Sequence, residues 1–534
     1  MQKKIKSLVK KIVGINTNIT KSSFKEENFC KSLKCLVSNN PDLLSNNSHV
    51  GKRKDGKNFY YEINKIAEGF DFINNELDNY GDKNIPDINE YDGFQSGTPM
   101  DTKPFSLCIS NVKKLLRKKN LYTYQSTTGD IYEKEKIVNY LAREGFKINS
   151  DKNYDGIGVD NIVFTCSTTQ AFSVILNVIM KEEDVILMTG PNYGLFALEP
   201  ERLNGRVEIL PLKEEDDWYV NPDSLSKKID EINEELKKEF KGKSYIPSVK
   251  AFLNMNPHNP MGRVMNDKNK ELLYKIGDVC LEKGVFVIDD LIYRDLTFDR
   301  ESLALPLASN PKYFNNTISL FGLSKSYGLA SFRAAFIAAP IPICRGISSS
   351  IFQYMDSIPT PQIAAVCGAY NGTDKRYKEY NKYFSKIMPE YIYRYNLFKS
   401  LLNGIDTVDK KYHARIKKDI YKYEKDNDIR NKLLSGIKDI NLLCTVDSGF
   451  FAVLDFTKLK HKKYKDMCIE NDMDLLKYLY IKGKMKCIMG YNMSWPEDGR
   501  LIARVNFSVP IKALINNMKI LNNAVEDLKW LNII

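Results

Sequence analysis

Long hydrophobic runs are missing from this sequence of 534 residues. The longest uninterrupted apolar stretch, residues 334–344, contains two prolines and is far shorter than the roughly 18 residues that a membrane-spanning helix needs. The basic first residues lack both a long apolar segment and a small-residue cleavage site, which argues against a secretory signal. We therefore expect a protein with no membrane partner.

Metal-binding and disulfide patterns are also missing. The ten cysteines are scattered, no CxxC pair occurs, and the four histidines give no zinc-ligand spacing. Scattered cysteines of this kind are typical of reduced thiols in a cytosolic protein. The sequence predicts a cytoplasmic location and no metal site.

Nucleotide-binding and common hydrolase motifs are incomplete or absent. The Gly-Ile-Gly at 156–158 lacks the third glycine of a dinucleotide fingerprint, and the Gly-Lys-Ser at 242–244 lacks the first glycine of a P-loop. No HExxH or GxSxG sequence occurs. The net charge of +12 is spread thinly over the chain, so we expect no nucleic-acid partner.

The composition itself is that of a globular protein, with 43% hydrophobic and 27% charged residues. From about residue 125 to about residue 340, short apolar runs alternate with helical periods. This alternation predicts an α/β fold with a mostly parallel sheet flanked by helices. The expected strands are 161–165, 184–188, 249–255, 285–288 and 317–321, and the expected helices are 131–145, 169–180 and 268–283.

Shifts in composition divide the chain into parts. The final part is expected to hold strands at 450–456 and 502–507, a closing helix at 511–531, and a charged insertion at 405–441 that is solvated and partly helical. The parts are an N-terminal extension (1–90), a segment packing with the small domain (91–124), a large domain (125–390) and a smaller α+β C-terminal domain (391–534).

Three polar segments follow expected strands directly. Asn-Pro-His-Asn-Pro-Met-Gly at 256–262 follows the third strand, Asp290-Leu-Ile-Tyr293 follows the fourth, and Ser324-Lys325 follows the fifth. Taken singly, they could be a turn, a helix cap and a surface lysine. Because ligands of parallel sheets bind beyond the carboxyl ends of the strands, their shared position indicates one site.

Together these segments resemble the class I/II aminotransferases, which are pyridoxal-phosphate (PLP) enzymes of fold type I. Residues 256–262 resemble the family's NPxNPTG, with Met261 in place of Thr, and 290–293 resemble its DExY. Ser324-Lys325 with Arg333 resembles SxSK…R. Further matches in the family's order are Pro191-Asn192-Tyr193 to PxY, Arg504-Val-Asn-Phe507 to RxxF, and Tyr124…Gly129 to the family's Y…G segment.

The resemblance implies that PLP is the cofactor and that each matched residue has a role toward it. Lys325 would form the Schiff base with the PLP aldehyde and then move the substrate proton. Asp290 would pair with the ring nitrogen and keep it protonated. The remaining ring contacts implied are hydrogen bonds from Asn259 and Tyr293 to the ring oxygen, and stacking by Tyr193.

The phosphate and substrate contacts also follow from the resemblance. Arg333 and the start of the helix after strand 161–165 would bind the phosphate. Tyr124 would reach the phosphate of a neighbouring subunit, which implies a homodimer with shared active sites. Arg504 would bind the substrate carboxylate. The other implied contacts are Ser167, Thr168, Thr169 and Ser324 to the cofactor, and Gly97 and Asn259 to the substrate.

The leading interpretation is an aminotransferase that moves the amino group of an L-amino acid to a 2-oxo acid. A PLP-dependent lyase, decarboxylase, synthase or oxidase acting on an amino acid is the alternative, because all of them weaken a bond at Cα through the same ring. A transcription regulator with a DNA-binding domain at 1–90 is disfavoured, since no helix-turn-helix pattern occurs there. Partner binding by 405–441 is disfavoured relative to a solvated surface segment.

Overall fold

The computed structural model describes residues 66, 69–70, 72–88, 92–98, 103–118, 123–148 and 156–530. Most of the expected N-terminal extension at 1–90 therefore lies outside the described residues. Residues 65–534 form one compact unit. The boundaries expected at residues 124 and 390 stay predictions.

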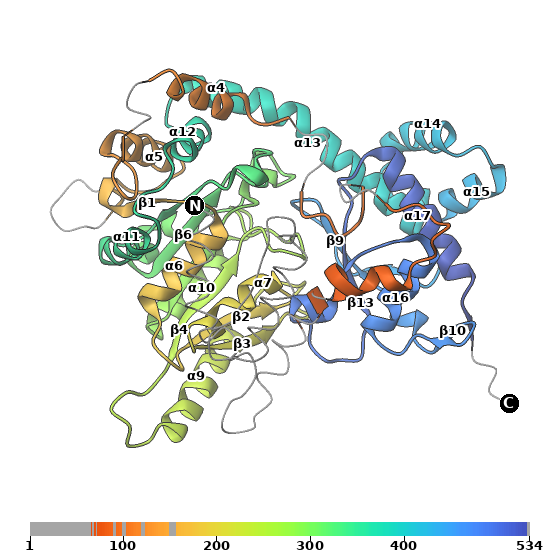
Figure 1. Ribbon diagram of the computed structural model, residues 1–534, viewed down its shortest axis with the longest axis horizontal. Helices are drawn as coiled ribbons and strands as arrows, with labels where there is room; N and C mark the ends of the chain where they lie inside the picture. Colours follow the sequence, from red (N-terminus) through yellow and green to blue (C-terminus); the bar gives the residue numbers. More distant parts are fainter. Residues whose placement is uncertain are drawn as a thin grey trace, which may run out of the picture. The chain divides into compact units, whose positions relative to one another are not determined.

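A seven-stranded sheet forms the first half of the fold, in the order β1-β7-β6-β5-β4-β2-β3 (Figure 1). The neighbours from β6 to β3 pair in parallel, whereas β7 runs antiparallel to both β1 and β6. The mostly parallel sheet predicted from the sequence is therefore confirmed. The strands are β1 (Ile162–Thr165), β2 (Val185–Gly190), β3 (Arg206–Pro211), β4 (Val249–Met255), β5 (Phe286–Asp290), β6 (Thr317–Gly322) and β7 (Ala335–Ala338).

Burial explains why these strands could be predicted. Every residue of β1, β2, β6 and β7 is buried, as expected for strands covered on both faces. The edge strand β3 has a mixed burial pattern and gives no continuous apolar run, so it was not expected. Strand β7 was not expected either, although it lies inside the apolar stretch 334–344. The helices around this sheet are α4 (Ser106–Leu115), α5 (Ile131–Arg143), α6 (Thr168–Ile179), α7 (Gly194–Ala197), α8 (Glu199–Arg202), α9 (Pro222–Glu239), α10 (Lys270–Glu282), α11 (Ile341–Met355) and α12 (Thr360–Ala369).

The long helix α13 (Asp374–Asn403) leads into an antiparallel four-stranded sheet in the order β12-β13-β9-β8. Its strands are β8 (Asn441–Leu442), β9 (Phe451–Asp455), β12 (Ile488–Met489) and β13 (Ile502–Asn506). A three-stranded sheet holds β10 (Lys462–Tyr464), β11 (Met467–Cys468) and β14 (Lys529–Trp530). The helices of this part are α14 (His413–Tyr423), α15 (Asn427–Ser435), α16 (Asp472–Gly483) and α17 (Ile511–Glu526).

Two expectations about this part can be refined. The closing helix was expected to reach residue 531, but α17 ends at Glu526 because the chain then pairs with β10 as strand β14. The charged segment 405–441 is helical in part, as expected. Its helices α14 and α15 pack against α13 and α17 through the buried side chains of Ile416, Ile420 and Leu433.

One hydrophobic cluster joins the two larger sheets. It contains Leu187, Phe252 and Val287 from the seven-stranded sheet together with Val453 and Ile502 from the four-stranded sheet. This packing holds the ends of the strands of the seven-stranded sheet close to β9 and β13. Within the described residues, no helix is long and apolar enough to cross a membrane.

Candidate active site

The three polar segments meet because their strands are neighbours. Strands β4, β5 and β6 are adjacent and parallel, so their carboxyl ends lie at one edge of the sheet. The backbone N–H of Asn256 donates to the carbonyl of Asp290 at 3.0 Å, and that of Leu291 donates to the carbonyl of Leu320 at 3.0 Å. The hydrogen-bonded ladder thus extends to the residues that carry the predicted chemistry.

Asp290 is a buried carboxylic acid at the end of β5. Its Oδ1 accepts a hydrogen bond from the Ile292 backbone N–H at 3.1 Å. Burial raises the pKa of Asp290 to about 7, and the neighbouring Asp289 adds to the rise while Lys325 opposes it. A cation placed against this carboxylate would therefore be held strongly, because it would relieve the cost of the buried charge.

Lys325 follows β6 and is half-buried. Its Nζ donates a hydrogen bond to the Gly97 carbonyl at 2.6 Å. Desolvation, together with the charges of Arg504 and Arg333, lowers the pKa of Lys325 to about 8, while Asp290 opposes the shift. A sizeable fraction of this amine is thus uncharged near neutral pH, which is the form that attacks a carbonyl carbon.

Arg504 is a buried cation on β13. Its guanidinium lies over the Phe451 ring at 3.9 Å, and its Nη1 donates to Asn259 Oδ1 at 3.4 Å, whereas its Nε has no hydrogen-bond partner. Among the residues that the structure describes, no carboxylate lies within ion-pair distance of it. A buried guanidinium without an anion is unfavourable, so the arrangement favours binding of a carboxylate ligand.

An anion-attracting corner lies at the start of α6. Ser167 is the N-cap residue, and its Oγ accepts a hydrogen bond from the Gln170 backbone N–H at 3.1 Å. Ser167 and Thr168 are buried and Thr169 is exposed. Arg333 has an exposed side chain, and its charge opposes the rise in the pKa of Cys166, next to Ser167. The free N–H groups of a helix start and a nearby guanidinium together favour a phosphate.

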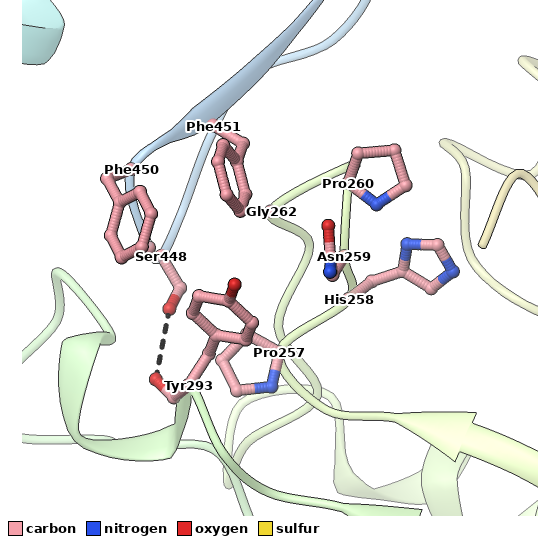
Figure 2. A pocket seen from close by; sticks show the side chains of 10 residues that line it. Pro257, His258, Asn259, Pro260, Gly262, Tyr293, Ser448, Phe450 and Phe451 are labelled. Atoms are coloured by element: carbon pink, nitrogen blue, oxygen red, sulfur yellow. Dashed lines mark hydrogen bonds between the residues drawn. The ribbon is translucent and has the colours of Figure 1, made fainter. Parts of the chain in front are cut away.

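Aromatic rings line the space between these groups. Burial raises the pKa of Tyr193 and that of Tyr293, and the Arg504 charge opposes both shifts. Tyr293 packs edge-on against Phe450 at 5.7 Å between ring centroids. Figure 2 shows a small hollow in which Tyr293 and Asn259 lie near the two phenylalanines. Its lining residues are Pro257, His258, Asn259, Pro260, Gly262, Tyr293, Ser448, Gly449, Phe450 and Phe451.

This geometry agrees with comparisons to known proteins. The sequence model of the family described as aminotransferase class I and II matches residues 88–415. The chain belongs to this family. The sequence is 25% identical over 272 residues to a probable aspartate/prephenate aminotransferase of Aquifex aeolicus, covering 50% of this chain and 61% of that protein. It is 26% identical over 269 residues to the cystathionine beta-lyase PatB of Bacillus subtilis, covering 49% of this chain and 62% of that protein.

The chain therefore spans about three fifths of the length of these two relatives. The solved structure of the aspartate aminotransferase from Rhizobium meliloti matches 90% of this chain and 98% of its own, with a TM-score of 0.64 at 14% identity. This likeness concerns the fold. The predicted fold class, fold type I of the PLP-dependent transferases, is confirmed.

The structure brings most of the residues expected from the family motifs into one place. Side chains that follow the strands of the large sheet and Arg504 on β13 lie close enough to shift one another's pKa. Ser324 is buried next to Lys325, and Tyr124 has an 88% exposed side chain. The roles assigned to these residues stay predictions. The residues that meet are Gly97, Tyr193, Asn259, Asp290, Tyr293, Lys325, Arg333 and Arg504.

Sequence reasoning missed three residues beside the site. Phe451 makes a cation–π contact with the Arg504 guanidinium. Asn506, fully buried on β13, donates through Nδ2 to the Ser96 carbonyl at 2.9 Å and so ties down the segment that contacts Lys325. His258 connects two loops of the site. Asn506 and His258 lie inside the family motifs at 504–507 and 256–262, whereas Phe451 was signalled only by its place in the expected strand 450–456.

The donor set of the site fits PLP. Family members use this cofactor, and the site offers an amine with a lowered pKa, a buried carboxylic acid and an anion-attracting corner, as an aldehyde, a pyridine nitrogen and a phosphate require. Within the described residues, no group of three or more His, Cys, Asp or Glu side chains could hold a metal ion.

Proposed function

We propose that this protein is a PLP-dependent aminotransferase that transfers the amino group of an L-amino acid to a 2-oxo acid. The observation that carries the proposal is the electrostatic coupling of three groups: the buried acid Asp290 and the guanidinium of Arg504, which has no ion-pair partner among the described residues, both act on the pKa of the Lys325 amine. An amine, an acid and a carboxylate-binding cation are the groups that amino-group transfer requires.

When bound, the cofactor supplies the aldehyde and an electron-withdrawing ring. Lys325 would hold the cofactor and then, as a free amine, move the proton from the substrate Cα. Asp290 would face the ring nitrogen and keep it charged, and Asn259 and Tyr293 would bind the ring oxygen. Arg333 and the start of α6 would bind the phosphate, while Arg504 would fix the substrate carboxylate and thereby orient the Cα–H bond.

A lyase is the second candidate, favoured by the similarity to the cystathionine beta-lyase of Bacillus subtilis. The same amine, acid and guanidinium would serve this reaction, because it too begins with proton removal from Cα. The two functions differ in the product. Amino-group transfer leaves the nitrogen on the cofactor, whereas a lyase releases it as ammonia with a 2-oxo acid.

A homodimer in the cytoplasm belongs to the same proposal. Several apolar side chains on α5, α7 and α11 and before α5 are exposed, and in this proposal a second copy of the chain covers them. The free thiols of the eight cysteines among the described residues suit a reducing compartment. The exposed apolar side chains include Tyr124, Ile131, Tyr132, Leu195 and Phe352.

An amino-acid panel scored by the absorbance change of the bound cofactor tests the proposal. We expect conversion to the pyridoxamine form without ammonia release for at least one amino acid. Lys325→Ala should lose this conversion, and Arg504→Met should need at least about tenfold more amino acid, since a charge-assisted bidentate contact is lost. Lys227→Ala, which changes a lysine whose side chain is 79% exposed, is the matched control.

Full turnover by Lys325→Ala would contradict the assignment of the amine. Stoichiometric ammonia release with no pyridoxamine form would instead favour the lyase. A purified chain that takes up no PLP would contradict both candidates.

A further inference from the structure

His258 lies between two loops that carry predicted site residues. It is the third residue of the Asn-Pro-His-Asn-Pro-Met-Gly turn and stands directly before Asn259. Its Nε2 is 2.9 Å from Thr189 Oγ1, near the end of β2, and its Nδ1 is 3.4 Å from the Met261 backbone nitrogen. Figure 2 shows the imidazole turned away from Tyr293 and the two phenylalanines.

The hydrogen bonds fix the tautomer of this imidazole. The Met261 backbone N–H donates to Nδ1, so Nδ1 carries no proton. The Thr189 hydroxyl donates its single proton to the Pro191 carbonyl at 2.9 Å, so the contact at Nε2 has His258 as the donor. Burial lowers the pKa of His258 to about 3, which keeps the ring neutral.

Each end of the connection holds a different part of the site. At one end, Thr189 and Asn192 fix the loop before α7, because Thr189 Oγ1 donates to Pro191 and Asn192 Nδ2 donates to the Thr189 carbonyl at 2.9 Å. That loop leads to Tyr193. At the other end, the His258 backbone N–H donates to the Arg263 carbonyl at 2.9 Å and closes the turn that carries Asn259.

Resting on the proposed function, we propose that His258, as a neutral Nε2–H donor to Thr189, is a positioning residue that sets the spacing between the ring-stacking Tyr193 and the ring-binding Asn259. Within the motif at 256–262, the family resemblance gives an expected role to Asn259 only, so the positioning role of His258 is an addition to it. His258 takes no part in proton transfer, because both of its nitrogens are engaged and its ring is turned away from Tyr293.

Four variants of the full-length PLP-loaded protein test this inference. His258→Phe keeps the ring but loses both hydrogen bonds, and Thr189→Val keeps the shape but loses the hydroxyl. We expect either change to weaken PLP binding and to lower kcat by about tenfold each, as small displacements in active sites do. The KM for the amino acid should rise by a smaller factor than kcat falls, because Arg504 is retained and loses only the alignment of its 3.4 Å contact with Asn259.

The conservative variants provide the controls. His258→Gln places an amide N–H near the Nε2 position, and Thr189→Ser keeps the hydroxyl, so both should stay within about threefold of the wild type. The double variant His258→Phe/Thr189→Val should lose less than the sum of the two single effects, since the two changes share the His258–Thr189 contact. If His258→Phe fails to fold, Thr189→Val compared with Thr189→Ser gives the same readout.

A second measurement needs no cofactor. In ¹⁵N NMR spectra of the cofactor-free chain labelled with ¹⁵N-histidine, the signal that is lost in His258→Gln belongs to His258. Its chemical shifts should be those of a neutral imidazole protonated at Nε2, and they should not change from pH 6 to 8. Wild-type PLP affinity and kcat in Thr189→Val, or an imidazole that protonates in this range, would overturn the inference. A wild-type chain without PLP affinity would overturn it together with the proposed function, whereas failure of His258 alone would leave Lys325 and Asp290 unaffected.

Discussion

At the scale of single residues, the charge state of Lys325 decides when the site can react. Desolvation lowers the pKa of the amine most, and the charges of Arg504 and Arg333 act in the same direction against Asp290, so this pKa falls from 10.5 to about 8. A lowered lysine pKa means that the neutral, nucleophilic form gains population as the pH rises towards 8 and is nearly complete above 9. An ordinary surface lysine would be neutral only above pH 10.

The corresponding prediction concerns the rate of PLP uptake by the cofactor-free protein. Below pH 8 this rate should rise by up to about tenfold per pH unit and then level off, because only the neutral amine attacks the aldehyde. Stopped-flow absorbance from pH 6 to 10 measures it, with Lys325→Ala as the control that lacks the fast phase. A rate that keeps rising to pH 10 would show that the amine is not perturbed.

At the scale of secondary structure, the first turn of α6 combines a structural and a binding role. The Ser167 Oγ caps the helix through the Gln170 N–H, and the same turn faces the expected phosphate. An aspartate at this position can cap equally well but carries a negative charge. The two roles can therefore be separated by substitution.

We predict that Ser167→Ala lowers the free energy of unfolding by about 1 kcal/mol, whereas Ser167→Asp leaves it near the wild-type value. Ser167→Asp should nevertheless weaken PLP binding by about tenfold or more, because its carboxylate repels the phosphate. Urea unfolding of the cofactor-free protein and a PLP titration give the two quantities. Unchanged PLP affinity in Ser167→Asp would place the phosphate elsewhere.

At the scale of the whole molecule, the exposed apolar side chains favour assembly. Phe352 on α11 is 60% exposed and Ile131 at the start of α5 is 66% exposed. Exposed aromatic and aliphatic side chains next to a ligand site are typical of subunit interfaces. Tyr124, 88% exposed, would then complete the site of the second copy.

We predict that the wild-type chain sediments as a dimer and that Phe352→Asp raises the dimer dissociation constant by about 30-fold or more, as the loss of a buried interface aromatic does. Activity should fall with dilution in parallel. Tyr421→Asp, at a 46% exposed residue of α14, is the control for adding a charge elsewhere. A wild-type chain that is fully active as a monomer would contradict the shared site.

Much of the sheet could be predicted from the sequence because buried parallel strands are nearly continuous apolar runs. The run 249–255 coincides with β4, and the polar residues after β4, β5 and β6 identified Asn259, Asp290 and Lys325. The closing helix was predicted too long, because only the pairing of residues 529–530 with β10 ends it early. Local periodicity carries no information about such a distant partner.

Apolar runs and motif order are local properties of the chain, so the residues at the strand ends, and with them the amine, acid and amide of the proposed chemistry, could be identified from the sequence. The antiparallel insertion of β7, the contact of Lys325 with Gly97 and the His258–Thr189 connection could be found only in the folded chain. These features depend on groups far apart in sequence. The shifted pKa values of Lys325 and Asp290 likewise arise from burial and neighbouring charge, which exist only in the folded chain.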